Sequence, residues 1–465
     1  MIYLCYRQHK LDFCNFLCYA VRGGGSMLNS VSELRSRDLY LNRLIAFQDT
    51  EPVKIITGIR RCGKSSLLKL MARHLRNSGV ANEQIIELNF ESMEFRGMGA
   101  EALYQYVKER LSHGKRAYLF FDEIQRVDQW QDAVNSFRVD FDCDIYVTGS
   151  NAYLLSSEYA TYLAGRSVEI KMLPLSFCEF LDFHGYTVRE RKSPSDGISK
   201  RIYDADGESY EPKELLEAYL KFGGMPGIAD VGLDTDKALT LLDGVYSTVV
   251  VRDILERERR RGQRQITDPD LLRKVIMFLA DNIGNITSIT SISNKLVHEK
   301  LLDSNRNGNP SVHTIQAYVG ALLESYVFYE IKRFDIKGKE YLRTLGKYYI
   351  VDIGLRNCLL GFRDMDTGHI IENIVYFELL RRGYDVAIGK VGDKEVDFIA
   401  TSADEKKYIQ VTESMNDPNT RERELAPLRG IRDNYEKVVI AGDIGHPVTQ
   451  DGIKIVKLID FLLDG

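Results

Sequence analysis

The sequence feature that most constrains the fold is an eight-residue segment that joins an apolar run to an amphipathic one. The run Val53–Thr57 predicts a buried strand, and Ser66–Asn77 predicts a helix. Between them stand Gly58, Ile59, Arg60, Arg61, Cys62, Gly63, Lys64 and Ser65. This is the spacing G-x-x-x-x-G-K-[ST] in a strand-to-helix turn, so we predict a phosphate-binding loop.

The chemistry of such a loop assigns a role to each of its parts. Glycines leave room for backbone N–H groups to turn toward a phosphate, and the following helix directs its positive end at the anion. We expect residues Gly58 to Ser66 to bind ATP, with Lys64 reaching the β- and γ-phosphates as a catalytic residue. The Ser65 hydroxyl is the expected Mg²⁺ ligand.

Two carboxylates follow another strongly apolar run, about fifty residues after the phosphate-binding loop. Tyr118–Phe121 predicts a buried strand that ends in Asp122 and Glu123. An acid at the tip of a buried strand acts on Mg²⁺, usually through water, and we assign that role to Asp122. Glu123 is then placed to act as general base on the attacking water, so we predict hydrolysis of ATP.

Two polar residues and an arginine complete the predicted catalytic set. Ser150 and Asn151 follow the run Asp144–Thr148, where a polar side chain can hold the attacking water. We prefer Ser150, and a helix N-cap is the alternative for either residue. Arg166 precedes the run Val168–Met172. In an oligomeric ATPase such an arginine enters a neighbour's site, and the alternative is a structural salt bridge.

The rest of the chain shows three changes of pattern. Strand-like and helical segments alternate up to about residue 172, which indicates a parallel sheet covered on both faces. Residues 186–213 are polar and broken by prolines and glycines, so we expect a loop or insertion. Later residues predict three helices, with Ser311 as an N-cap, then a hairpin and a final α/β region. We expect an N-terminal extension or annotation artefact (1–26), a nucleotide-binding domain (27–182), a polar insertion with a helical lid (183–265), a winged helix (266–362) and a small α/β domain (363–465).

Composition says little about the partner. The net charge of −5 gives no overall reason to expect nucleic acid. The seven cysteines contain no C-x-x-C pair, which fits a reducing cytoplasm better than a disulfide framework. No apolar stretch reaches the roughly 18–20 residues that span a bilayer, so we expect no membrane partner.

The combination of these motifs resembles a known family. TGIRRCGKSSLL, NFES, FFDEIQ, VTGSNAYLLS, LAGR and LPLSFCEF are similar to segments of archaeal and bacterial AAA-type ATPases with a C-terminal domain of unknown function. The similarity continues through KYYIVDIGLRN, HIIENIVYFELLRRGYDV, KVGDKEVDFIA and YIQVT, and covers nearly everything after Met27. The resemblance implies an α/β fold: a parallel-sheet AAA-type P-loop ATPase domain, a winged helix and a small α/β domain similar to restriction-endonuclease-like nucleases. It implies no substrate.

The nuclease-like resemblance weakens where the chemistry should lie. Glu372, Asp397 and Gln410–Thr412 occupy the nuclease-like positions. Such a site uses acids for Mg²⁺ and a lysine beside the second acid, where this chain has an amide and a threonine. Nothing in the sequence requires Lys390 or Lys394 to replace that lysine. We therefore predict no DNA cleavage.

Nucleic-acid binding has one supporting feature. Residues 266–334 carry seven basic and seven acidic side chains, whereas binding to a phosphate backbone favours a basic face. The stretch Arg257–Arg264 is the strongest positive cluster. It either grips nucleic acid or forms a solvated helix end paired with Glu256 and Glu258.

Three functional hypotheses follow. The leading one is a cytoplasmic, Mg²⁺-dependent ATPase that acts as a switch or motor on an unidentified protein partner, with a homo-oligomer expected if Arg166 acts between subunits. The second is an ATP-gated nucleic-acid-binding protein or nuclease, against which Gln410 and Thr412 argue. The third is an ATP-binding sensor with negligible turnover, against which Glu123 argues.

Overall fold

The computed structural model of the protein describes residues 34–112, 114–150, 165–193, 197–247, 253–255, 266–298, 310–363, 366–445 and 448–464. Residues 36–465 form one compact unit. The predicted N-terminal extension, Asn151 and the arginine-rich stretch 257–264 lie outside the described residues.

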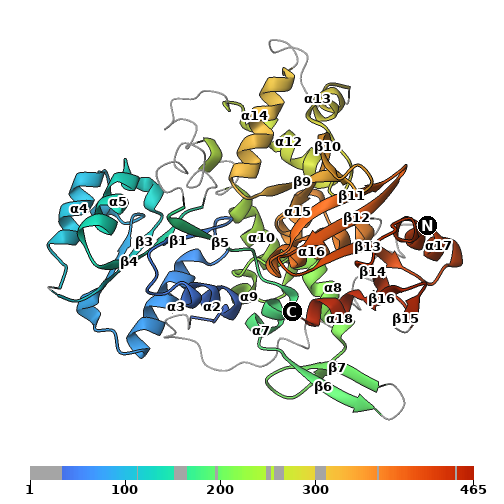
Figure 1. Ribbon diagram of the computed structural model, residues 1–465, viewed down its shortest axis with the longest axis horizontal. Coiled ribbons are helices and arrows are strands. Elements are labelled where there is room, and N and C mark those ends of the chain that lie inside the picture. The colour runs from blue at the N-terminus through green and yellow to red at the C-terminus, as the bar shows by residue number, and fades with distance from the viewer. Residues whose placement is uncertain are drawn as a thin grey trace. The chain divides into compact units, whose positions relative to one another are not determined.

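A five-stranded parallel sheet forms the first part of this unit (Figure 1), with the strand order β2-β3-β4-β1-β5. Its strands are β1 (Val53–Thr57), β2 (Ile85–Asn89), β3 (Ala117–Asp122), β4 (Cys143–Thr148) and β5 (Ser167–Lys171). β1 and β3 are buried along their whole length, as expected for apolar strands covered on both faces. The predicted parallel sheet is confirmed, and β1, β3, β4 and β5 begin and end within one residue of their predicted bounds.

Successive strand residues point to opposite sides of this sheet, and they are apolar on both sides. Helices therefore cover both faces. The helices are α2 (Asp38–Ala46), α3 (Lys64–Asn77), α4 (Ala100–Lys108) and α5 (Trp130–Asp140). Phe120 and Tyr146 belong to the core that includes α2 and α3, whereas Phe121 and Val147 belong to the core that includes α4 and α5. The two cores fix the carboxyl ends of β1, β3 and β4, where the predicted site residues lie.

The segment 186–213 is not the loop that we expected. It forms a three-stranded antiparallel sheet of β6 (Thr187–Ser193), β7 (Gly197–Tyr203) and β8 (Ser209–Tyr210). The loop interpretation was wrong because the breaker residues stand at element boundaries: Gly207 turns between β7 and β8 with φ +84°, and Pro212 begins the next helix. The alternative, an insertion, stays a prediction. Ile202 is fully buried and anchors the sheet to the main core.

The segments LPLSFCEF and KYYIVDIGLRN, both singled out in the sequence, meet in the helical region that follows. This region contains α7 (Phe177–Phe183), α8 (Pro212–Phe222), α9 (Ile228–Val231) and α10 (Thr235–Val245). After α8, a Cβ on Gly224 would lie 2.4 Å from the carbonyl oxygen of Leu175, and the Gly224 N–H donates to Asp352 Oδ2 at 2.7 Å. Asp352 also caps α15 (Ile353–Leu360) by accepting from the Leu355 N–H. These motif residues therefore hold distant segments together.

Three helices and a hairpin come next, as predicted. They are α12 (Pro269–Asp281), α13 (Ile289–His298), α14 (Val312–Glu324), β9 (Phe328–Asp335) and β10 (Glu340–Ile350). The Ser311 hydroxyl accepts from the Thr314 N–H at 3.1 Å, which confirms the predicted N-cap. β9 also pairs with β11, so the hairpin is the edge of a larger sheet. The winged helix stays a prediction.

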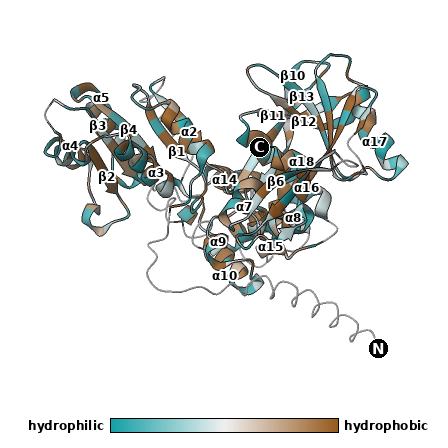
Figure 2. Ribbon diagram, turned by 90° about the horizontal axis from the view of Figure 1, so that it is seen from below, coloured by the Kyte–Doolittle hydropathy of each residue, from teal (hydrophilic) through white to brown (hydrophobic). Residues whose placement is uncertain are grey.

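That larger sheet has eight strands in the order β10-β9-β11-β12-β13-β14-β16-β15. Its further strands are β11 (Asp385–Val391), β12 (Lys394–Thr401), β13 (Lys406–Ser414), β14 (Glu436–Asp443), β15 (Val448–Gln450) and β16 (Ile453–Lys457). It packs with α16 (Thr367–Arg381), α17 (Pro418–Arg429) and α18 (Leu458–Leu463). α16 is buried on most sides, whereas α17 is largely hydrophilic (Figure 2). None of the helices in the described part of the chain combines the length and apolar character needed to cross a membrane.

Candidate phosphate-binding site

The loop between β1 and α3 is shaped by two glycines. Gly58 has φ +139° and Gly63 has φ +105°, both in the region that favours glycine. A Cβ on Gly58 would lie only 2.1 Å from the carbonyl oxygen of Met172, which follows β5. The loop backbone therefore takes a path that no larger residue at position 58 permits.

The other loop residues divide into buried supports and outward contacts. Ile59 and Cys62 are fully buried, whereas Ser66 is exposed on the first turn of α3. Arg60 pairs with Asp253 at 2.6 Å and with Glu91 at 2.7 Å, which ties the loop to two neighbouring segments. Arg61 is exposed, with φ +65°.

Lys64 begins α3 and is almost fully buried. Its ammonium group donates to the carbonyl oxygens of Gly58 at 2.9 Å and Ile59 at 3.1 Å. The positive charge is thus held against the loop itself, at the N-terminal end of a 14-residue helix. Both features favour an anion at this position.

Ser65 and Asp122, the two expected Mg²⁺ ligands, contact each other at the carboxyl end of β3. The Ser65 hydroxyl donates to Asp122 Oδ1 at 3.0 Å. Thr148 at the end of β4 donates to the same oxygen at 2.5 Å, and Asn89 at the end of β2 donates to Oδ2 at 3.1 Å. Nothing in the sequence pattern singles out Asn89 or Thr148, although both stand at the carboxyl ends of strands.

Glu123 lies beside this group and faces a different partner. Its N–H donates to Thr148 Oγ1 at 2.9 Å, and its carboxylate accepts from Ser150 at 3.2 Å and from Gln125. The carboxylate is nearly buried, with 8% of the residue exposed. Ser150 therefore contacts Glu123, its role in holding a water stays a prediction, and Asn151 is not described.

Arg166 lies away from the phosphate loop of its own chain. Its carbonyl oxygen accepts from the Val53 N–H at 2.9 Å, and β1 and β5 run parallel from this point. The phosphate loop follows the carboxyl end of β1, whereas Arg166 lies at the amino ends of β1 and β5. The loop and Arg166 are therefore at opposite ends of the strands. Its side chain is exposed. Any contact with a phosphate would therefore be with another subunit's site.

The acids of the predicted nuclease-like positions come together around a lysine that the sequence did not point to. Lys347 on β10 lies 2.7 Å from Glu372, 2.8 Å from Glu395 and 3.9 Å from Asp397. The Asp397 N–H donates to Gln410 Oε1 at 3.4 Å. A lone lysine inside the apolar segment LGKYYIVD was the available signal, but its partners are remote in the sequence.

The electrostatics of this group are those of a closed ionic cluster. Burial alone would raise the pKa of Glu372, but Lys347 holds that pKa below its ordinary value. Burial and the neighbouring Glu372 raise the pKa of Asp397. Among the residues that the structure describes, no group of three or more His, Cys, Asp or Glu side chains is arranged to hold a metal ion.

Comparison with known proteins agrees with the geometry of the first site. An AAA domain model matches residues 50–181, and a model of a domain of unknown function (DUF8612) matches residues 213–366. The parallel sheet, its loop and the paired residues Ser65 and Asp122 define an AAA-type P-loop ATPase domain.

Two relatives are similar to most of the chain. An uncharacterised protein of Haemophilus influenzae is 41% identical over 430 residues, which cover 92% of this chain and 98% of that protein. A second, from Methanocaldococcus jannaschii, is 32% identical over 395 residues, covering 83% of this chain and 78% of that one. The chain belongs to the same family as these two proteins. A Walker-type ATPase structure from Pyrococcus abyssi is similar over 70% of this chain and 95% of its own, at 16% identity and a TM-score of 0.44.

Proposed function

We propose that this protein binds ATP with Mg²⁺ at the phosphate loop, hydrolyses it, and uses the cycle as a switch or motor on a partner. The observation that carries the proposal is the meeting of Ser65 with Asp122 beside Glu123, at the edge of the sheet where the Lys64 loop begins. A loop alone accounts for phosphate binding, whereas the second carboxylate accounts for hydrolysis.

The residues present fit this nucleotide and its metal. The left-handed backbone at Gly58 and Gly63 forms a cradle of N–H groups, and Lys64 adds a positive charge to it. Ser65 and Asp122 supply the hydroxyl and carboxylate oxygens that hard divalent cations prefer. When bound there, Mg²⁺ would neutralise charge on the β- and γ-phosphate oxygens.

The chain's own groups divide the remaining work. Asn89 and Thr148 hold the Asp122 carboxylate in a fixed orientation through hydrogen bonds to both oxygens. Glu123 is the group that accepts the proton of the attacking water, and Ser150 orients its carboxylate. This pairing favours turnover over a sensor that only binds ATP.

The nuclease alternative gains no support from the C-terminal acids. Lys347 forms ion pairs with Glu372 and Glu395. Gln410, a neutral amide, accepts a hydrogen bond from the Asp397 N–H. We therefore propose that the C-terminal half recognises a partner. A measurement of ATP turnover with and without duplex DNA, single-stranded DNA and RNA distinguishes the partners: stimulation by one of them identifies a nucleic acid, and cleavage of DNA that Asp397→Ala abolishes would establish the nuclease.

Lys64→Ala tests the phosphate loop directly. A ligand at 100 times its dissociation constant stabilises the native state by about 2.7 kcal/mol, so ATP should raise the melting temperature of the wild type. The variant should show no such rise, because it lacks the cation at the loop. Its melting temperature without ATP serves as the control for the fold. A full ATP-dependent rise in Lys64→Ala would reject the assignment of the loop.

A further inference from the structure

A buried arginine outside the phosphate-loop motif donates a hydrogen bond to a backbone carbonyl of the loop. Arg37 stands immediately before α2, is 3% exposed, and precedes the residues that match the AAA domain model. Its Nη1 donates to the carbonyl oxygen of Cys62 at 3.1 Å and to that of Leu173 at 2.9 Å. The same guanidinium therefore joins the loop to the segment after β5.

The orientation of the Cys62 carbonyl group determines the direction of the next N–H group in the loop. In a planar trans peptide the C=O of one residue and the N–H of the next point in opposite directions. A hydrogen bond that fixes the Cys62 carbonyl thus also fixes the direction of the Gly63 N–H. Gly63 has φ +105° and, as a glycine, is free to take other conformations, so its orientation must be set by its contacts.

The segment after β5 gives Arg37 a rigid support. The Met172 N–H donates to the Thr57 carbonyl at 2.8 Å, and the Met172 carbonyl lies where a Cβ of Gly58 would be. Arg37 contacts the next two carbonyls, of Leu173 at 2.9 Å and of Pro174 at 3.4 Å. Both ends of the phosphate loop are therefore braced against residues 172–174.

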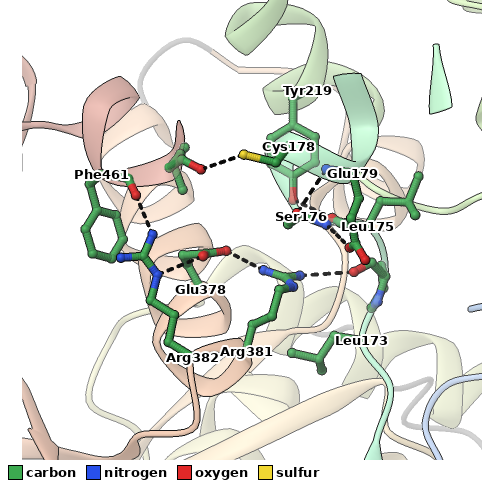
Figure 3. A network of polar contacts seen from close by, with 12 residues as sticks. Leu173, Leu175, Ser176, Cys178, Glu179, Tyr219, Glu378, Arg381, Arg382 and Phe461 are labelled. Carbon is green, nitrogen blue, oxygen red and sulfur yellow. Dashed lines mark hydrogen bonds and ion pairs between the residues drawn. The ribbon is translucent and has the colours of Figure 1, made fainter. Parts of the chain in front are cut away.

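A carboxylate orients the arginine. Glu179 on α7 accepts from Arg37 Nε at 2.8 Å and from Nη2 at 2.7 Å, a bidentate pair. Glu179 is itself held by Ser176, whose N–H donates to it at 2.8 Å within a capping box (Figure 3). Burial alone would raise the pKa of Glu179, but Arg37 holds that pKa below its ordinary value.

We propose that Arg37 is a positioning residue of the nucleotide site: it fixes the Cys62–Gly63 peptide so that the Gly63 N–H faces the phosphates. The proposal rests on the proposed ATP binding at the loop. Because loop N–H groups serve phosphates common to ATP and ADP, Arg37 supports the binding of both nucleotides equally. It does so without touching either.

Arg37→Lys tests this role, with Arg381→Lys as the matched control. Lysine keeps the charge opposite Glu179 but lacks the planar fork that reaches the carbonyls at the same time. Arg381 is also a buried arginine, paired with Glu378 at 2.6 Å and donating to the Pro174 carbonyl at 3.0 Å (Figure 3), but it has no contact with the loop. The two variants thus make similar changes on the same segment.

The dissociation constants of ATP and ADP are measured below the melting temperature of each variant. Arg37→Lys should raise both by about tenfold, the size expected for losing a hydrogen bond from a charged donor. Arg381→Lys should leave both within about twofold, even if its melting temperature falls. Unchanged constants in Arg37→Lys, an equal rise in both variants, or a rise for ATP alone would each overturn the proposal.

Glu179→Gln provides a second variant. It keeps the shape of the carboxylate and removes the charge that orients Arg37, so it should raise both constants by a smaller factor than Arg37→Lys. Failure of the proposed function would look different, because the wild type itself would then bind neither nucleotide. Normal binding by the wild type and by both variants would reject only the role of Arg37.

Discussion

Glu123 has φ +56°, a left-handed backbone conformation that few residues other than glycine adopt. The turn separates two neighbouring carboxylates: Asp122 faces Ser65, and Glu123 faces Ser150. Two adjacent acids therefore face different hydrogen-bond partners in one site. Local strain of this kind is common where a functional group must be held in one direction.

Glu123→Gln should separate binding from hydrolysis. The amide keeps the size of the side chain but cannot take up a proton, so turnover should fall by roughly 10²–10⁴-fold while the dissociation constant of ATP stays near that of the wild type. Steady-state turnover and nucleotide binding are measured in parallel. Glu101→Gln, which changes an exposed acid in the first turn of α4, should retain activity. Unchanged turnover in Glu123→Gln would assign the base to another acid.

At this scale the sequence was informative only where function imposes a short, continuous pattern. The loop motif and the Asp122–Glu123 pair were predictable because residue type and spacing within one segment define them. Asn89, Thr148 and Lys347 were not, because each acts on a carboxylate of a different segment. A polar residue in a strand looks the same in the sequence whether it faces water or a buried acid.

At the scale of secondary-structure elements, the sequence predicted the strands well where they are apolar and continuous, as in the sheet of β1 to β5. The prediction failed at β6 to β8, whose polar faces and boundary glycines resemble a loop when side-chain alternation is weak. The pairing of β9 with β11 was also not predictable, because strand partners in a mixed sheet depend on the whole topology. That pairing brings the Lys347 strand to the acids on α16 and β12.

Lys347→Met should destabilise the protein strongly. Removing the cation leaves Glu372 and Asp397 buried without their partner, a change that typically costs about 3–5 kcal/mol of the free energy of unfolding. The cost should be larger at pH 8 than at pH 5: Lys347 now holds the pKa of Glu372 down, and without it the acids take up protons as the pH falls. Chemical denaturation at the two pH values checks both expectations.

The control is Lys407→Met on β13. Lys407 pairs with Glu405 at 3.1 Å and Glu436 at 3.4 Å, but its side chain is 26% exposed. Its loss should therefore cost less than about 1 kcal/mol. If the two variants lost the same free energy at both pH values, the burial of the Lys347 cluster would have no energetic consequence.

On the scale of the whole molecule, the exposed Arg166 and the phosphate loop lie at opposite ends of the strands of one sheet. We propose that Arg166 acts on the site of a second subunit, with a structural role in its own chain as the alternative. The catalytic set would then be complete only in an assembly, and an isolated chain would be nearly inactive.

A mixing experiment separates these roles. Turnover per subunit should rise with protein concentration, and Arg166→Ala mixed with Glu123→Gln should recover part of the activity, since one chain supplies the base and the other the arginine. Arg116→Ala, at the same end of the strands as Arg166 and paired with Asp142 at 2.7 Å, should keep wild-type turnover. Turnover independent of concentration, without recovery on mixing, would favour the structural role.

The packing of α18 against α7 has a consequence for synthesis on the ribosome. Cys178 on α7 donates to the carbonyl oxygen of Leu462 at 3.3 Å, and the two residues are 284 positions apart. At roughly 5–20 residues per second, translation separates their appearance by about 15–60 s. During that interval α7, which carries the Glu179 partner of Arg37, has an uncovered face. Arg37 thus pairs with a carboxylate on a helix whose packing is completed by some of the last residues to be translated.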